Sequence, residues 1–163
     1  MTDHLPPGAG LAVGAIVYPL AWSAVLIASS GDWCSADASL AVLRWLLSWF
    51  FLPDPVAWAS VNFWLRKSVH FLAYGCLYFL WFRAIPPYGR RHPWRATGLA
   101  LGLCLVVALL DEGIQRWSPS RTPSWGDLLL DLSGAGAAAG LAACLYRPRE
   151  PEPRPEASQT RLV

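Results

Sequence analysis

The sequence predicts an all-α protein, a four-helix transmembrane bundle with a short interfacial helix between the first and second spans. Hydrophobic residues make up 55% of the 163 residues, and the mean hydropathy is +0.34. The chain contains 10 tryptophans, and its charged residues (15%) gather in short clusters between long uncharged runs. This profile is typical of a membrane protein rather than a soluble domain. The length allows about four spans of roughly 20 residues each.

The first span is predicted over residues 9–29, within an uncharged run from Leu5 to Gly31. We interpret it as a retained anchor, because residues 1–4 hold no lysine or arginine; a cleavable signal peptide is the alternative. Residues 32–60 mix polar residues with leucine and phenylalanine at helical spacing. This pattern predicts a short helix lying along the membrane interface, anchored by Trp45 and Trp49.

Three further spans are predicted over residues 61–82, 96–114 and 125–146. The fourth span contains small residues that favour close helix packing, namely Gly134, Gly136 and Gly140. Together the spans form one predicted transmembrane domain over residues 1–146. Residues 147–163 are rich in proline, arginine and glutamate, which predicts a disordered cytoplasmic tail.

The distribution of arginine predicts the orientation in the cell membrane. Four arginines and no acidic residue occur between the second and third spans: Arg83, Arg90, Arg91 and Arg95. Arg147 and Arg149 follow the fourth span. Cytoplasmic loops carry an excess of lysine and arginine, so both segments, and therefore both termini, are predicted to be cytoplasmic. Residues 32–60 and 115–124 would then face outward.

Polar residues are expected to converge at the outward end of three spans. Lys67, His70 and Tyr74 share one helix face because they are spaced i, i+3, i+7. The third and fourth spans and the loop between them contribute Asp111, Glu112, Gln115, Arg121, Ser124, Asp127 and Asp131. Ionisable side chains beside membrane-depth segments are energetically costly. The sequence therefore predicts a functional site here.

The residue types indicate several chemistries. Lys67 and Arg121 are candidates to bind a phosphate-bearing headgroup. His70, Asp111 and Glu112 are the catalytic candidates for proton transfer. The predicted substrate-binding set is completed by Tyr74, Gln115, Ser124, Asp127 and Asp131. A divalent cation held by Asp111, Glu112 and Asp127 is an alternative, because hard cations take oxygen ligands. The sequence leaves open both the cofactor and the question of whether the protein is an enzyme.

Two other interpretations stay open. The network could be purely structural, with Ser124 and Asp127 capping the fourth span and Lys67 neutralising carboxylates. The second interpretation is a small transporter. Residues 99–110 and 132–145 count against it, because they are uncharged and offer no polar pathway across the bilayer. An integral lipid phosphatase would need a second histidine near an arginine-rich motif, and His92 falls in the predicted inner loop.

Three motifs together resemble the VanZ-like family of small bacterial integral membrane proteins. They are Lys67-x-x-His70-Phe71-x-x-Tyr74, Asp111-Glu112-x-x-Gln115, and Arg121-x-x-Ser124-x-x-Asp127 with Gly134 beyond. The resemblance covers about residues 61–146. One position departs from it, because Asp131 stands where the family often has asparagine.

The resemblance implies an integral membrane protein with a role in the cell envelope. The family is associated with low-level resistance to the glycopeptide teicoplanin, and no established biochemical activity comes with it. We expect the outward-facing site to bind or modify an anionic lipid-linked or cell-envelope substrate, with the lipid bilayer as a partner and no nucleic acid. The alternative is a non-enzymatic binding or assembly partner whose polar network is structural.

Overall fold

The computed structural model describes residues 9–31, 35–46, 55–85, 93–117 and 124–145. Within these ranges the chain forms helices and no strands, so the all-α prediction is confirmed. The helices are α1 (Ala9–Ser29), α2 (Ala36–Leu46), α3 (Pro55–Ala84), α4 (Pro93–Gln115) and α5 (Trp125–Leu145). The predicted tail and the loop containing Arg121 lie outside the described residues.

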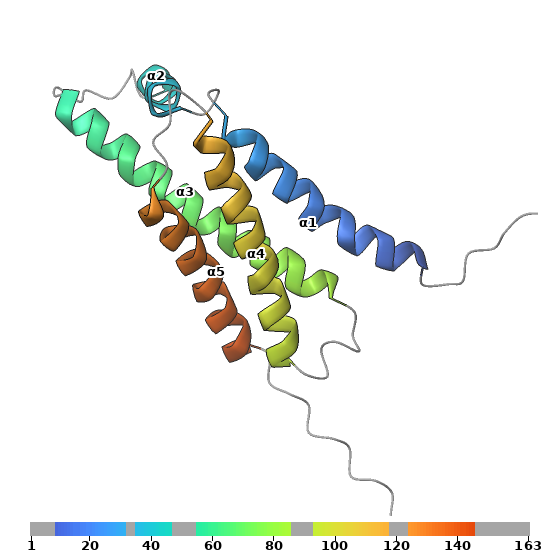
Figure 1. The fold of residues 1–163 in the computed structure, drawn as a ribbon. Coiled ribbons are helices and arrows are strands. Elements are labelled where there is room, and N and C mark those ends of the chain that lie inside the picture. Colours follow the sequence, from blue (N-terminus) through green and yellow to red (C-terminus); the bar gives the residue numbers. More distant parts are fainter. Residues whose placement is uncertain (1–8, 32–34, 47–54, 86–92, 118–123, 146–163) are drawn as a thin grey trace, which may run out of the picture.

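Helix α3 is the centre of the bundle (Figure 1), because it packs against each of the other four helices and most extensively against α5. The long helices alternate in direction along the chain. The C-terminal ends of α1 and α4 therefore lie near α2, the first half of α3 and the start of α5. We call this end of the bundle the α2 end. It gathers the segments that carry the predicted polar site.

The helix boundaries follow local sequence signals. Both α3 and α4 begin at a proline, Pro55 and Pro93. Proline suits the first helical turn because its fixed φ matches the helix and its missing N–H needs no partner there. Helix α3 therefore starts earlier than the predicted residue 61. The predicted short helix between the first two spans exists as α2, and its interfacial position stays a prediction. Trp45 is 75% exposed there, whereas Trp49 lies outside the described residues.

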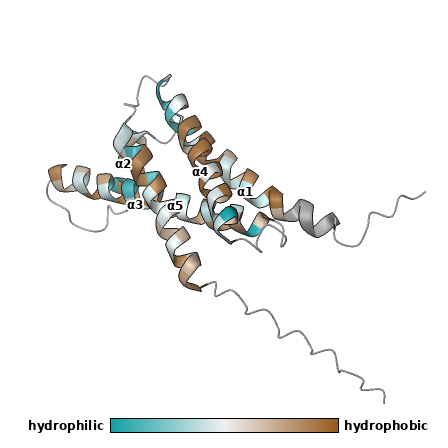
Figure 2. Ribbon diagram, turned by 60° about the horizontal axis from the view of Figure 1, so that its bottom comes forward, coloured by the Kyte–Doolittle hydropathy of each residue, from teal (hydrophilic) through white to brown (hydrophobic). Residues whose placement is uncertain are grey.

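Two described helices, α4 and α5, are long and apolar enough to cross a membrane. Helix α1 has 21 residues and contains an apolar stretch, Ala15–Ser29. Helix α3 has the length, but polar residues interrupt it, which lowers its mean hydropathy; Figure 2 shows this interruption. Those residues are Asn62, Arg66, Lys67 and His70. The helical architecture is thus established, and four membrane crossings remain a proposal.

Helices α3 and α5 meet with their backbones in close contact. A Cβ atom added at Gly134 would overlap the backbone carbonyl of Phe71. A Cβ atom at Gly75 would lie 3.4 Å from the carbonyl oxygen of Gly134 and 3.8 Å from Cβ of Ala138. Such small residues let helix backbones approach closely. The predicted packing role of Gly134 is therefore confirmed.

The same prediction was wrong for Gly136 and Gly140, which are exposed and have no atom within 4 Å of an added Cβ. A helix turns by about 100° per residue, so neighbours two positions apart cannot share a face. The face of α5 that packs inward around Gly134 is instead formed by alanines, namely Ala135, Ala138, Ala139 and Ala142.

On the side of the Phe71–Gly134 contact away from the α2 end, aromatic side chains link α3 to its neighbouring helices. Tyr78 stacks on Phe82 with ring centroids 5.7 Å apart, and its hydroxyl hydrogen-bonds the hydroxyl of Thr97 at 3.2 Å. The indole Nε1 of Trp22 donates to the Ala73 carbonyl at 3.0 Å, which ties α1 to α3. These contacts fix the helices around the polar residues at the α2 end.

Candidate functional site

Two polar pairs connect α3 to α5 at the α2 end. The ammonium group of Lys67 forms an ion pair with Asp127, and both side chains are partly exposed. One turn deeper, His70 Nδ1 lies 3.1 Å from Asp131 Oδ1. Asp131 is 2% exposed. The predicted convergence of the polar stripes on these two helices is therefore present in the structure.

The close helix crossing explains why the deeper pair forms. His70 precedes Phe71, whose backbone contacts Gly134, and Asp131 lies one helical turn before that glycine. The contact holds the two backbones at a separation that a histidine and a short aspartate can bridge. A larger residue at position 134 would move the two side chains apart.

Asp111 brings α4 and the end of α1 into the same site. Its carboxylate is 4% exposed and accepts hydrogen bonds from Ser30 Oγ and, at 3.3 Å, from Gln115 Nε2. Ser30 was not among the predicted site residues. The signal was the Ser29–Ser30 pair, which closes an otherwise apolar run. Side chains from four helical segments therefore meet around one buried point.

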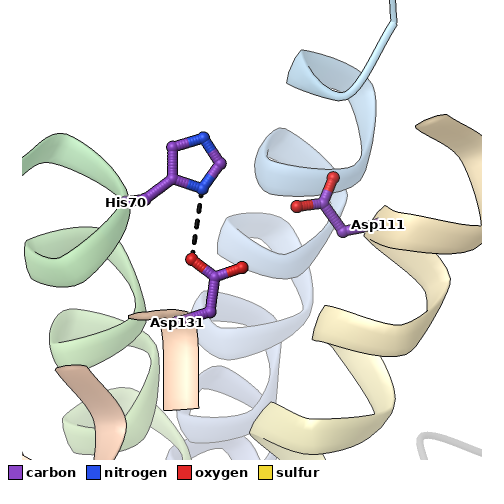
Figure 3. Close-up of side chains that lie close together, drawn as sticks. All are labelled: His70, Asp111 and Asp131. Carbon is purple, nitrogen blue, oxygen red and sulfur yellow. Dashed lines mark hydrogen bonds and ion pairs between the residues drawn. The ribbon is translucent and has the colours of Figure 1, made fainter. Parts of the chain in front are cut away.

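The deepest part of this site is a cluster of three side chains of types that can bind a metal ion (Figure 3). His70, Asp111 and Asp131 each offer a ligand atom, and these atoms all lie within 4.8 Å of one another. Tyr74, which is 1% exposed, completes the group. Its hydroxyl lies close to Asp111 and Asp131 and makes no well-formed hydrogen bond within the described part of the chain. We call these four residues the His70 cluster.

The predicted cation ligands Asp111, Glu112 and Asp127 are not the set that the structure brings together. Asp111 faces His70 and Asp131, whereas Glu112, the next residue along α4, points to another face of the helix. Asp127 pairs with Lys67 instead. Adjacent helical residues diverge by about 100°, so Asp111 and Glu112 cannot both face the interior.

Glu112 and Ser124 lie together away from the His70 cluster. Glu112 Oε1 accepts a hydrogen bond from the Ser124 backbone N–H at 3.3 Å, which joins α4 to the start of α5. Ser124 Oγ accepts from the Gly126 N–H at 3.2 Å, so Ser124 caps α5 as its sequence position suggested. Both residues line a surface hollow of about 390 Å³ beside Trp125. Their catalytic and substrate-binding roles stay predictions, as does that of Arg121.

Two adjoining pockets between α2 and α3 lead to His70. The first, here the polar pocket, has a volume of about 330 Å³ and is lined by charged residues that include Asp37, Lys67 and Asp127. The second, here the apolar pocket, has a volume of about 420 Å³ and includes Val42, Leu43, Leu46, Leu65 and Val69. The two pockets share a wall made of Asn62, Arg66 and His70.

The shared wall also holds α2 in place. Asn62 Nδ2 donates to the Ala36 carbonyl at 3.1 Å, and Arg66 Nη1 donates to Ser39 Oγ at 3.2 Å. Neither Asn62 nor Arg66 was among the predicted site residues. Their spacing with His70 is i, i+4, i+8, which is a single helix stripe and was the available signal.

Comparison with known proteins identifies the family. A sequence model described as VanZ/LLP1 matches residues 9–146. The chain belongs to the VanZ/LLP1 family. No curated protein and no solved structure is significantly similar to it.

The VanZ/LLP1 match extends well beyond the three motifs. It includes all five described helices and therefore Ser30, α2 and the shared wall, in addition to residues 61–146 where the motifs lie. VanZ/LLP1 membership, together with two helices long and apolar enough to cross a bilayer, indicates a membrane protein.

Proposed function

We propose that this VanZ/LLP1 protein crosses the cell membrane four times, through α1, α3, α4 and α5, with both termini in the cytoplasm. The α2 end then faces outward. There the protein binds or modifies an anionic substrate with an apolar tail, such as a lipid-linked precursor of the cell envelope.

Exposed apolar side chains support the four crossings. Large hydrophobic residues are exposed on every long helix, including Val17, Leu20, Trp64, Leu72, Leu109 and Leu141. Soluble monomers rarely expose such extensive apolar surface, whereas lipid would cover it. Helix α3 has 30 residues and is therefore about 45 Å long. That exceeds the roughly 30 Å hydrocarbon core, so its polar first half can reach the interface.

Basic residues at the opposite end support the orientation. Arg83 lies in the last turn of α3, and Arg95 lies in the first turn of α4, far from the α2 end. The Arg95 guanidinium sits over the Trp94 ring, 4.8 Å from its centroid. Arginine and tryptophan together are typical of a cytoplasmic membrane interface.

We expect labelling to check this topology in a variant without the four native cysteines. A cysteine at position 117, where Trp117 is 91% exposed, should react with a membrane-impermeant maleimide added to intact cells. A cysteine in place of Arg83, which is also exposed, should react only after lysis. The reverse pattern would contradict the proposed orientation.

The observation that carries the proposed binding role is the pair of adjoining pockets. A polar pocket beside an apolar pocket fits a molecule with a charged head and an apolar tail. Arg66 lines both pockets and joins Lys67 and Arg121 as a candidate for binding phosphate, because a guanidinium can hold phosphate oxygens in a bidentate manner.

A purely structural network is the second candidate function. The hydrogen bond from Ser30 to Asp111 favours it, because it joins the end of α1 to α4 without any ligand, and Gln115 of α4 donates a second hydrogen bond to the same carboxylate. A buried carboxylate satisfied in this way also stabilises helix packing. The two candidates differ in their consequences for protein abundance, which the following experiment measures.

We expect His70→Gln to abolish the envelope phenotype while the protein stays abundant in the membrane. The phenotype is measured as teicoplanin tolerance and as the mass-spectrometric profile of lipids and wall precursors, in cells with and without the protein. Ser133→Ala is the matched control, since Ser133 is exposed and its hydroxyl bonds only the Leu130 carbonyl of its own helix, at 2.6 Å. It should behave as the wild type.

The outcomes separate the candidates. A lipid or precursor species that changes with the wild type and not with His70→Gln supports modification of the substrate. An unchanged profile with lost tolerance supports binding alone. A His70→Gln protein that retains full tolerance contradicts the proposed function, and one that disappears from the membrane favours the structural network.

A further inference from the structure

We propose that the His70 cluster is a binding site for one divalent transition-metal cation of the Zn²⁺ type. His70, Asp111 and Asp131 would be its protein ligands, contributed by α3, α4 and α5. The inference deepens the proposed function, on which it rests for its purpose: the cation would hold a phosphate oxygen of the anionic substrate.

The geometry fits such an ion with little movement. Zn²⁺ binds nitrogen and oxygen ligands at about 2.0–2.2 Å, so neighbouring ligands in a tetrahedral site are about 3.4 Å apart. The separation of His70 Nδ1 and Asp131 Oδ1 is 3.1 Å. All three ligand atoms lie within 4.8 Å of one another, so Asp111 would need to approach by about 1.4 Å at most.

The ligand types and their surroundings favour the same assignment. One imidazole with two carboxylates suits zinc or manganese better than calcium, which prefers oxygen ligands alone. Hydrogen bonds from Ser30 and Gln115 hold the Asp111 carboxylate in orientation, as groups behind metal ligands commonly do. A protonated His70 would offset one negative charge at most, whereas a dication would offset both buried carboxylates.

Tyr74 provides an independent indication that something binds here. Its side chain is almost fully buried, and its hydroxyl lies beside Asp111 without a well-formed hydrogen bond among the described residues. Buried hydroxyl groups nearly always form a good hydrogen bond, so this one has the capacity to bind a further group such as a water molecule or a ligand oxygen. The hydroxyl lies beside Asp111 and Asp131, where it would donate a hydrogen bond to a water or phosphate oxygen on the cation.

The cation would also be accessible from the pockets. Three protein ligands leave an open position in a tetrahedral zinc site. His70 lines both the polar and the apolar pocket, so a headgroup lying in the polar pocket would approach the cation past Lys67 and Asp127. The headgroup phosphate would then be held by the cation on one side and by Arg66 on the other.

Metal binding tests the inference without any substrate. The purified full-length protein in detergent is stripped with a chelator, dialysed against buffered Zn²⁺ and analysed for bound metal by mass spectrometry. We expect one Zn²⁺ per chain, with Mn²⁺ competing and Ca²⁺ failing to compete. His70→Gln and Asp131→Asn should each weaken Zn²⁺ binding by about 10–100-fold or more. His92→Gln is the matched control and should bind as the wild type.

Tyr74→Phe tests the inference even if the ligand variants fold poorly, because it removes a hydroxyl that makes no well-formed hydrogen bond among the described residues. It should remain folded and bind Zn²⁺ several-fold more weakly. No Zn²⁺ binding by the wild type, or binding that His70→Gln, Asp131→Asn and Tyr74→Phe leave unchanged, would overturn the inference. If the wild type binds no metal and His70→Gln still abolishes the envelope phenotype, the proposed function stands without a cation.

Discussion

Gly134→Ala is expected to destabilise the protein by about 3 kcal/mol, because the new methyl group has no space between α5 and α3. The added Cβ would overlap the backbone carbonyl of Phe71, and a backbone group cannot rotate away as a side chain can. The helices would have to separate, and the His70–Asp131 pair would separate with them. The effect is measured as the apparent Tm in detergent, which should fall by about 6–12 °C, together with the envelope phenotype.

Gly136→Ala is the matched control, two residues along the same helix. An added Cβ there meets nothing within 4 Å. Alanine is the better helix former by about 1 kcal/mol, so this variant should be as stable as the wild type or slightly more stable. Equal destabilisation by both substitutions would show that general disturbance of α5, and not its contact with Phe71, explains the loss.

Asp111→Ala should lower the free energy of unfolding by a similar amount, about 3 kcal/mol. The substitution leaves the buried amide of Gln115 without its Asp111 acceptor and breaks the hydrogen bond from Ser30 Oγ to α4, so that the Ser30 hydroxyl retains only the Leu26 carbonyl of its own segment. Each unsatisfied buried polar group costs about 1–3 kcal/mol. Since Ser30 follows α1, the contact between α1 and α4 should loosen first. Hydrogen exchange should therefore become faster in the last turn of α1.

The neighbouring Glu112→Ala provides the comparison. Glu112 is only partly buried and accepts one hydrogen bond, from the Ser124 backbone N–H at 3.3 Å. Its loss should cost about 1 kcal/mol or less, because water can replace it. If Glu112→Ala were the more damaging of the two variants, the inward orientation of Asp111 would be wrong.

Several features could be predicted from sequence because they depend on local patterns. The apolar runs predicted the long helices, and the mixed segment after residue 32 predicted α2. The i, i+3, i+7 spacing placed Lys67, His70 and Tyr74 on one stripe, and the motifs indicated the family. The number of tryptophans and the distribution of arginine indicated a membrane protein, because both can be read directly from the sequence.

Other features depend on how each helix is rotated about its axis. The sequence did not show that Asp111 faces the interior while Glu112 faces the start of α5, or that Gly134 packs while Gly136 does not. Helices with apolar residues on every side carry no stripe that reveals this rotation. For the same reason the His70 cluster differs from the predicted set of cation ligands.

The sequence by itself determined the helical composition, the family and the end of the bundle at which the polar residues gather. Those properties follow from hydrophobic run length and from residue spacing within single helices. Only the tertiary structure decided which of these residues share one buried point and that two pockets lead to it. The physical reason is that the contact between Phe71 and Gly134 fixes the separation of α3 and α5, and such a contact between distant residues leaves no local pattern in the chain.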